Sequence, residues 1–211
     1  MFDLSSKTKV NKKFKLSELY KLIRADKAVK ADASNVASVA LTNVLNADTM
    51  NFTLIKDVKE IYVFEIVLTA KIIPALFISA LDKAVNFHTV FVLTYNGQTL
   101  LYGAYKEYGD KGIKVGKYYA TDWMQDYSIS IPILTSCLDD IYTTIIDELI
   151  PITARQGETT REFVNRYGEV VKLKKEIEKL QRLVDTEKQP KKRFEINAQL
   201  KELIKELKIL E

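Results

Sequence analysis

The chain has 211 residues, of which 47% are hydrophobic and 28% are charged. This composition supplies enough apolar side chains for a folded core and excludes a chain that is disordered throughout. A single cysteine excludes an intramolecular disulfide and a cysteine-rich zinc site, and the first residues lack the apolar run of a secretory signal, so we expect a cytoplasmic protein.

The first part of the chain is predicted to form a basic arm followed by two helices. Met1–Phe14 combines several lysines with few apolar residues, which predicts an arm or loop. Leu16–Arg24 has apolar residues at helical spacing, with Ser17 as a candidate N-terminal cap. Ser34–Asn46 is predicted as a second helix packed on the first, because its apolar residues also recur three and four positions apart.

β-strands are predicted from Asn51 onward, where apolar and β-branched residues begin to alternate at Phe52, Leu54, Ile61, Val63 and Val67. The apolar window 61–81 is not expected to cross a membrane, because Glu65, Lys71 and Pro74 interrupt it. We interpret it as a buried strand followed, after Pro74, by a helix.

An antiparallel hairpin is the clearest prediction in the middle of the chain. Asn96-Gly97 separates the β-prone segments Thr89–Tyr95 and Thr99–Tyr105, and both residues tolerate the positive φ of a tight turn. Ile113–Tyr119 is predicted as a further strand. Pro132–Ile150 has the apolar stripe of a long helix that packs on the sheet.

The last 57 residues are predicted to form two helices, the first capped by Thr159 or Thr160 and the second beginning near Pro190. Their apolar stripes are Val170, Leu173, Ile177, Leu180 and Val184, and then Ile196, Leu200, Leu203, Leu207 and Leu210. Such stripes require cover by another helix, so we predict an antiparallel, coiled-coil-like hairpin.

The predicted fold is therefore α+β. A mainly antiparallel or mixed sheet, packed by helices, forms a globular domain over residues 1–154 that includes the basic N-terminal arm. Residues 155–211 form the helical hairpin, which we interpret as an interaction arm. Charge is divided unevenly between these parts: residues 1–30 and 155–211 are net basic, and residues 31–154 carry eight Lys and Arg against fourteen Asp and Glu. Basic ends around an acidic middle suit contact with the chain's own core, with a partner or with phosphates.

No motif in the sequence predicts a catalytic, cofactor or metal site. Gly112–Lys117 departs from a phosphate-binding loop in the spacing of its glycines, and Tyr118 replaces the hydroxyl residue that would hold Mg²⁺. Cys137 and His88 are the only residues of their types, and Cys137 lies on the apolar stripe of its helix, where a thiol packs as a small hydrophobe.

Two acidic residues leave a divergent Mg²⁺-dependent nuclease open as a minor alternative. Asp57 and Glu65 lie on or near one predicted strand, but Val67 occupies the position where such an enzyme needs a lysine. Glu65 is the more interesting of the two, because a carboxylate within an apolar strand needs a partner or a function unless it lies at a sheet edge or faces outward.

Two sets of residues are candidates for binding. The candidate interaction surface on the hairpin consists of Phe163, Tyr167, Val171, Ile177, Leu203 and Ile204. The candidate nucleic-acid contacts lie in the N-terminal arm and at the expected hairpin tip; they are Lys9, Lys12, Lys13, Lys188, Lys191, Lys192 and Arg193.

Several short patches, spread over nearly the whole length, carry a resemblance to a known family. They are Thr8–Lys12, Phe64–Ile66, Ala80–Val85, Ala104–Glu107, Thr121–Trp123, Glu187–Gln189 and Arg193–Asn197. The chain resembles the prokaryotic family called domain of unknown function 4391. None of these patches is a catalytic signature. The resemblance implies companions such as helicases and DNA methyltransferases, in gene neighbourhoods that resemble restriction or antiphage systems.

Our leading hypothesis from the sequence is a non-enzymatic accessory or adaptor subunit without a cofactor. It would contact a DNA-processing enzyme, such as the helicase or methyltransferase of the same system, or another copy of itself. The alternative is direct nucleic-acid binding by the basic arm and the hairpin tip.

Overall fold

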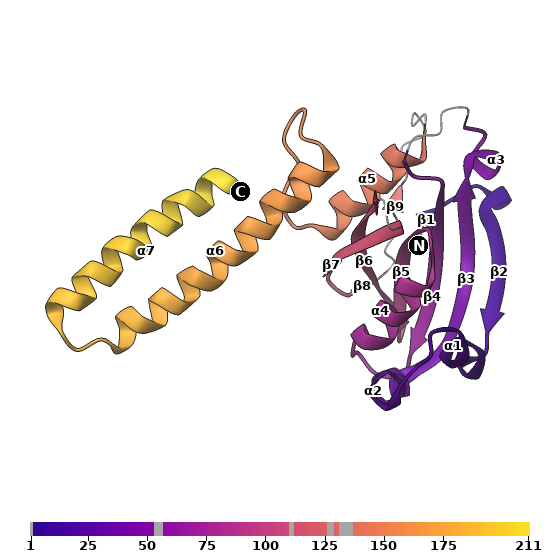
Figure 1. Cartoon of the computed structure of the whole chain (residues 1–211), viewed down its shortest axis with the longest axis horizontal. Coiled ribbons are helices and arrows are strands. Elements are labelled where there is room, and N and C mark those ends of the chain that lie inside the picture. The colour runs from indigo at the N-terminus through magenta and orange to yellow at the C-terminus, as the bar shows by residue number, and fades with distance from the viewer. Residues whose placement is uncertain (1, 53–56, 110–111, 126–128, 131–136) are drawn as a thin grey trace. The chain divides into compact units, whose positions relative to one another are not determined.

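The computed structural model describes residues 2–52, 57–109, 112–125, 129–130 and 137–211. The chain divides into two compact units, Met1–Leu149 and Ile150–Glu211. The fold is α+β, as predicted: a mixed, mostly antiparallel sheet with helices makes up the first unit, and two long helices packed together dominate the second (Figure 1).

The main sheet has the strand order β2-β3-β4-β5-β6-β7, with neighbours antiparallel except for the parallel pair β4 and β5. The strands are β2 Lys9–Phe14, β3 Val36–Asn46, β4 Glu60–Leu68, β5 His88–Tyr95, β6 Gln98–Gly109 and β7 Gly112–Ala120. Strand β8, Met124–Gln125, also pairs with β6, and β1, Phe2–Asp3, pairs separately with β9, Ile129–Ser130.

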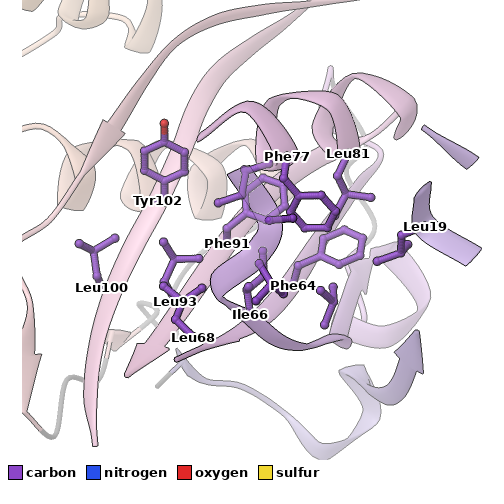
Figure 2. Packing of buried hydrophobic residues seen from close by; sticks show 14 of the residues in the cluster. Leu19, Phe64, Ile66, Leu68, Phe77, Leu81, Phe91, Leu93, Leu100 and Tyr102 are labelled. Atoms are coloured by element: carbon purple, nitrogen blue, oxygen red, sulfur yellow. The ribbon is translucent and has the colours of Figure 1, made fainter. Parts of the chain in front are cut away.

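One face of the sheet is covered by α1 Leu16–Leu22, α2 Lys27–Asp32 and the crossover helix α4 Ala75–Ala84. Side chains alternate between the faces of a strand, so Phe64 of β4 and Phe91 of β5 share this face. Their rings stack with centroids 5.7 Å apart. Figure 2 shows Phe77 and Leu81 of α4 packed over them, which makes this cluster a fully buried core.

The opposite face of the sheet packs against α5 Leu138–Leu149. Ile61 and Val63 of β4 are buried here, in the opposite phase to Phe64. Gly103 of β6 allows the close approach of this helix, since a Cβ at this position would lie 3.0 Å from Leu149 Cδ1. The predicted helix over residues 132–150 is confirmed from Leu138 onward, and its first part lies outside the described residues.

The prediction of a helix over residues 34–46 was wrong, because most of this segment is the long strand β3. The pairing of β3 with β4 shifts register between Val36 and Ser38 and again between Leu41 and Asn43. Each shift resets the alternation of inward and outward side chains. The buried residues therefore fall at 36, 39, 41 and 45, and the first of these intervals imitates helical spacing.

The prediction of an N-terminal arm was also wrong, because Lys9–Phe14 forms β2 at the edge of the main sheet. Lysines on an edge strand hinder pairing with the edge of another molecule. Helix α1 was predicted correctly, but its N-terminal cap is Lys15 and not Ser17. No strand begins at Asn51, which instead ends the short helix α3 Ala47–Met50 in a left-handed conformation.

The other strand predictions are confirmed. Asn96 and Gly97 both have positive φ and connect β5 to β6 in an antiparallel hairpin. The strand predicted over residues 113–119 is β7. After Pro74, the predicted helix is α4.

The second unit is the predicted helical hairpin, formed by α6 Thr160–Thr186 and α7 Pro190–Leu210 (Figure 1). Thr159 caps α6 as expected: its hydroxyl accepts a hydrogen bond from the Glu162 amide, and the Glu162 carboxylate accepts one from the Thr159 amide. All residues of the two predicted stripes are buried or half-buried, and we call these stripe residues the seam.

Candidate functional site

The candidate interaction surface of the hairpin is only partly exposed. Phe163 is 1% exposed, so it belongs to the buried residues and cannot meet a partner directly. Ile177 and Leu203 are half-buried members of the seam. Tyr167 and Val171, four residues apart on one flank of α6, are also half-buried, whereas Ile204 of α7 is exposed. Substitutions at Ile177 or Leu203 would therefore disturb the hairpin itself.

An open groove of about 730 Å³ runs along the hairpin between α6 and α7. Leu180 and Leu203 supply its apolar part, and Ala198 lies beside them. Charged residues of both signs surround these side chains, namely Glu176, Lys201, Glu202 and Lys205. The groove thus combines an apolar strip with charges that could orient an occupant.

Further large apolar side chains of the hairpin lie outside its seam. Leu183 of α6 and Phe194 and Ile209 of α7 are exposed, Phe194 by 77%. Two helices cover only one side of each other, so apolar residues elsewhere on their surfaces stay in contact with water. Sequence periodicity missed these residues because they do not belong to either stripe.

The predicted basic cluster of the tip is exposed throughout. Lys188 lies in the short connection between the helices, and Lys191, Lys192 and Arg193 lie in the first turn of α7, next to Phe194. Lys9, Lys12 and Lys13 are exposed as well, but they belong to β2 of the other unit. Lys12 places its ammonium 5.3 Å from the centre of the Phe14 ring.

A nearly buried arginine joins the two ends of the hairpin. Arg166 of α6 donates from Nε and Nη2 to the two carboxylate oxygens of Glu158, at 2.7 and 2.8 Å. Its Nη1 donates to the Leu210 carbonyl at 2.5 Å, and Nη2 also donates to the Thr153 carbonyl at 2.9 Å. The hydrogen bonds from Arg166 lower the pKa of Glu158 to about 2. Arg155 donates to the Ile209 carbonyl, so two arginines satisfy carbonyls that the end of α7 leaves unpaired.

The first unit contains a completely buried ion pair. Lys106 of β6 and Asp82 of α4 are both 0% exposed in their side chains, with Nζ 2.6 Å from Oδ1. Lys106 Nζ also donates to the Asp82 and Phe87 carbonyls, at 3.2 and 2.9 Å. The other oxygen of Asp82 accepts a 2.6 Å hydrogen bond from the Tyr118 hydroxyl, and the Thr89 hydroxyl also donates to this carboxylate. Burial lowers the pKa of Lys106, while the carboxylate of Asp82 opposes that change.

Aromatic side chains surround the backbone of β6 beside this pair. The Tyr142 hydroxyl of α5 accepts a 2.7 Å hydrogen bond from the Lys106 amide and donates a 3.0 Å bond to the Ala104 carbonyl. His88 lies against the Tyr142 ring with centroids 4.3 Å apart. Burial lowers the pKa of His88 to about 4, so this histidine is neutral at pH 7.

The sequence did not predict this buried network. Lys106 and Asp82 are 24 positions apart, and each on its own resembles an exposed charge of an amphipathic element. A usable signal was present, since both residues lie within patches that carry the family resemblance, Ala80–Val85 and Ala104–Glu107. Because the charged groups of Lys106 and Asp82 find their partners inside the protein, the network is suited to holding α4 on the sheet.

The two acidic residues considered for a nuclease lie apart. Asp57 acts electrostatically on His88, which pairs with Ile61, whereas Glu65 pairs with Val92. Ile61 and Glu65 are four residues apart on β4, which corresponds to about 13 Å at a rise of ~3.3 Å per residue. Asp57 and Glu65 therefore do not converge on one metal ion, and no group of three or more His, Cys, Asp or Glu with metal-binding geometry occurs within the described residues.

Glu65 is not at a sheet edge but in the central strand β4, where it is half-buried on the face opposite α4. It lines a pocket of about 210 Å³ together with residues of β2, β3 and β5. The lining residues are Leu4, Lys9, Asn11, Thr42, Asn43, Val63, Glu65 and Val92. This pocket brings Glu65 together with Lys9, which the sequence had placed in a separate arm.

One known protein family matches nearly the whole length of both units. A model of the family described as Domain of unknown function (DUF4391) matches residues 2–207. The chain belongs to this family. No curated protein and no solved structure matches the chain. The matched range thus includes the sheet, the buried network and nearly all of the hairpin, and the family's description assigns no reaction to any of them.

Within the described part of the chain, no helix is both long enough and apolar enough to cross a bilayer. The apolar window 61–81 forms β4 and the start of α4, as the sequence indicated.

Proposed function

We propose that this protein is a non-enzymatic binding subunit whose helical hairpin holds an amphipathic helix of a larger, DNA-processing partner. The groove between α6 and α7 carries this proposal. It offers Leu180 and Leu203 to an apolar helix face and surrounds them with acidic and basic side chains. A helix lying in such a groove is a common mode of recognition between proteins.

The energetics of the groove favour an apolar occupant. Covering an exposed leucine or isoleucine stabilises a complex by up to about 1.5–3 kcal/mol per side chain, before the cost of association. Leu180 and Leu203, which line the groove, are half-buried, and Ile204, which does not line it, is exposed, so each retains area that a partner could cover. Ion pairs between a partner and Glu176, Lys201 and Lys205 would determine the orientation of the bound helix more than they would raise its affinity.

The resemblance described above supplies the class of partner. A helicase or methyltransferase of a restriction or antiphage system would provide the DNA-processing activity, and this protein would provide contacts. A second copy of the chain is the competing occupant of the groove, because exposed apolar residues on a helical hairpin also support self-association.

Filling the groove is expected to prevent partner binding without unfolding the hairpin. Ala198 is exposed and lines the groove, so Ala198→Trp should fill it with an indole. A photo-crosslinking residue at Gln199, introduced in the native host, should first form an adduct with a DNA-processing enzyme. Affinity of the purified pair, measured by calorimetry, should then fall at least about tenfold in Ala198→Trp, since part of the apolar contact is lost.

Glu195→Trp is the matched control, because Glu195 is exposed on the same helix and does not line the groove. Circular dichroism should show equal helix content for both variants. Adducts formed only with copies of this chain would identify self-association instead. An equal loss of affinity in both tryptophan variants would exclude the groove as the binding site.

A second candidate function, direct nucleic-acid binding, is favoured by the exposed tip. Three consecutive basic residues, Lys191 to Arg193, lie next to the exposed ring of Phe194. Basic side chains bind phosphates, and an exposed aromatic ring can stack on an unpaired base. This combination suits a single-stranded nucleic acid.

Neutralising the tip is expected to weaken such binding and its dependence on salt. Changing Lys191, Lys192 and Arg193 to Gln should reduce the slope of log K against log salt by about 2, because each phosphate contact on a single strand contributes about 0.7. Fluorescence anisotropy with a labelled oligonucleotide measures this slope. The matched control changes the exposed Lys172, Lys175 and Lys179 of α6 to Gln. Equal slopes in both triple variants would refute a role of the tip.

A further inference from the structure

A second pocket, around Glu65, lies in the first unit and shares no lining residue with the groove of the hairpin. Its floor is apolar, formed by Val63 of β4 and Val92 of β5, which are both buried. Its polar rim contains Glu65 from the middle of the sheet and Lys9 from the edge strand. The two charges come from strands that are separated by β3, so the fold and not the local sequence brings them to one pocket.

The charges of this pocket are not neutralised by each other. Among the residues that the structure describes, neither Glu65 nor Lys9 forms an ion pair, and neither side chain has a hydrogen-bond partner. A half-buried carboxylate in a sheet of mostly apolar residues loses hydration without gaining a protein partner. An occupant that carries opposite charges would restore both interactions.

The edge strand is shaped locally around the pocket. Pairing of β2 with β3 shifts register between Lys9 and Lys12, and Asn11 within this bulge has φ of 51°. Asn11 and Asn43 both line the pocket, and the Asn43 amide nitrogen donates a 2.8 Å hydrogen bond to the Thr8 hydroxyl. That bond leaves the amide oxygen of Asn43 as an acceptor. Bulges that re-aim side chains are common next to binding sites.

We propose that this pocket binds a small zwitterion of the free amino-acid class. Its ammonium would contact the Glu65 carboxylate, its carboxylate would contact the Lys9 ammonium, and its side chain would cover the valine floor. The pocket volume of about 210 Å³ accommodates a molecule of that size but not a folded partner. One carboxylate with amide neighbours is a poor site for a divalent cation, which prefers several oxygen ligands.

Calorimetric titration of the full chain with each standard amino acid tests this proposal. At least one amino acid should bind with a Kd in the millimolar range or tighter. For that amino acid, Glu65→Gln and Lys9→Met should each weaken binding by about tenfold or more, because each removes a charged hydrogen bond. Lys13→Met is the matched control, since Lys13 is exposed on the same strand and does not line the pocket.

Analogues of the ligand, tested on the unaltered protein and on the two variants, identify which pocket residue contacts each of its charges. The N-acetyl derivative, which lacks the ammonium, should bind more weakly, and Glu65→Gln should weaken it no further. The primary amide, which lacks the carboxylate, should behave in the same way towards Lys9→Met. The proposal is overturned if no amino acid binds, if binding survives both variants unchanged, or if the two analogues bind as well as the parent.

Discussion

Replacing Lys106 with Met is expected to lower the free energy of unfolding of the first unit by about 3–5 kcal/mol, the largest effect we expect from a single substitution. Lys106 and Asp82 are both fully buried and 2.6 Å apart. Without the ammonium, the Asp82 carboxylate remains in the core with hydrogen bonds from two hydroxyls but no opposite charge. Such an uncompensated charge costs more than the lost pair interaction alone.

Urea unfolding followed by fluorescence of Trp123, the single tryptophan, measures this loss, because its ring packs against the core of the first unit. The double variant Lys106→Met/Asp82→Asn should recover a large part of the stability, since no charge is then left buried. Lys114→Met, at an exposed position of β7, should change stability by no more than about 0.5 kcal/mol. A loss below 1 kcal/mol in Lys106→Met would show that the buried pair does not stabilise the fold as inferred.

Replacing Arg166 with Met is expected to loosen the hairpin, at a cost of about 2–3 kcal/mol. This substitution removes the bidentate contact with Glu158 and leaves the Leu210 and Thr153 carbonyls without their donor. This cost is below the roughly 3–5 kcal/mol of breaking a fully buried pair, because the Glu158 side chain is still 10% exposed and its carboxylate can regain water.

Hydrogen exchange measured by mass spectrometry should show faster exchange over residues 203–210 in Arg166→Met, because the end of α7 loses its attachment to α6. Hydrogen exchange should be measured at pH 7. The pKa of Glu158 is lowered from 4.5 to about 2, so its contribution is complete above pH 4.5 and is lost as the pH falls towards 2.

Arg182→Met is the matched control for the same helix. Arg182 pairs with Glu178 at 4.0 Å, but both side chains are largely exposed, at 82% and 69%. Water screens such a pair, so we expect a change of no more than about 0.5 kcal/mol and unaltered exchange at the end of α7. Equal exchange in the two arginine variants would contradict a holding role for Arg166.

The candidate binding surfaces were only partly predictable from the sequence. The basic tip could be predicted from the sequence, because four charged residues close together near the start of a helix are expected to be exposed whatever the tertiary structure. Phe163 was misassigned because a stripe residue and a surface residue look alike when the neighbours are unknown. The pocket around Glu65 could not be predicted, since its charged residues lie 56 positions apart on strands that are not adjacent.

By itself, the sequence determined the elements whose signals are local. The Asn96-Gly97 turn depends on two residues that accept positive φ, and the hairpin of α6 and α7 depends on repeated spacing and on the cap at Thr159. Tertiary structure decided whether residues 36–46 form a helix or a strand, because bulges in the pairing with β4 reset the side-chain alternation. It also decided that Lys106 meets Asp82 and that Lys9 shares a pocket with Glu65. The physical reason is that these charged residues are far apart in the sequence and meet only when the sheet brings distant strands and helices together. The spacing of residues along the chain does not predict which of them will meet.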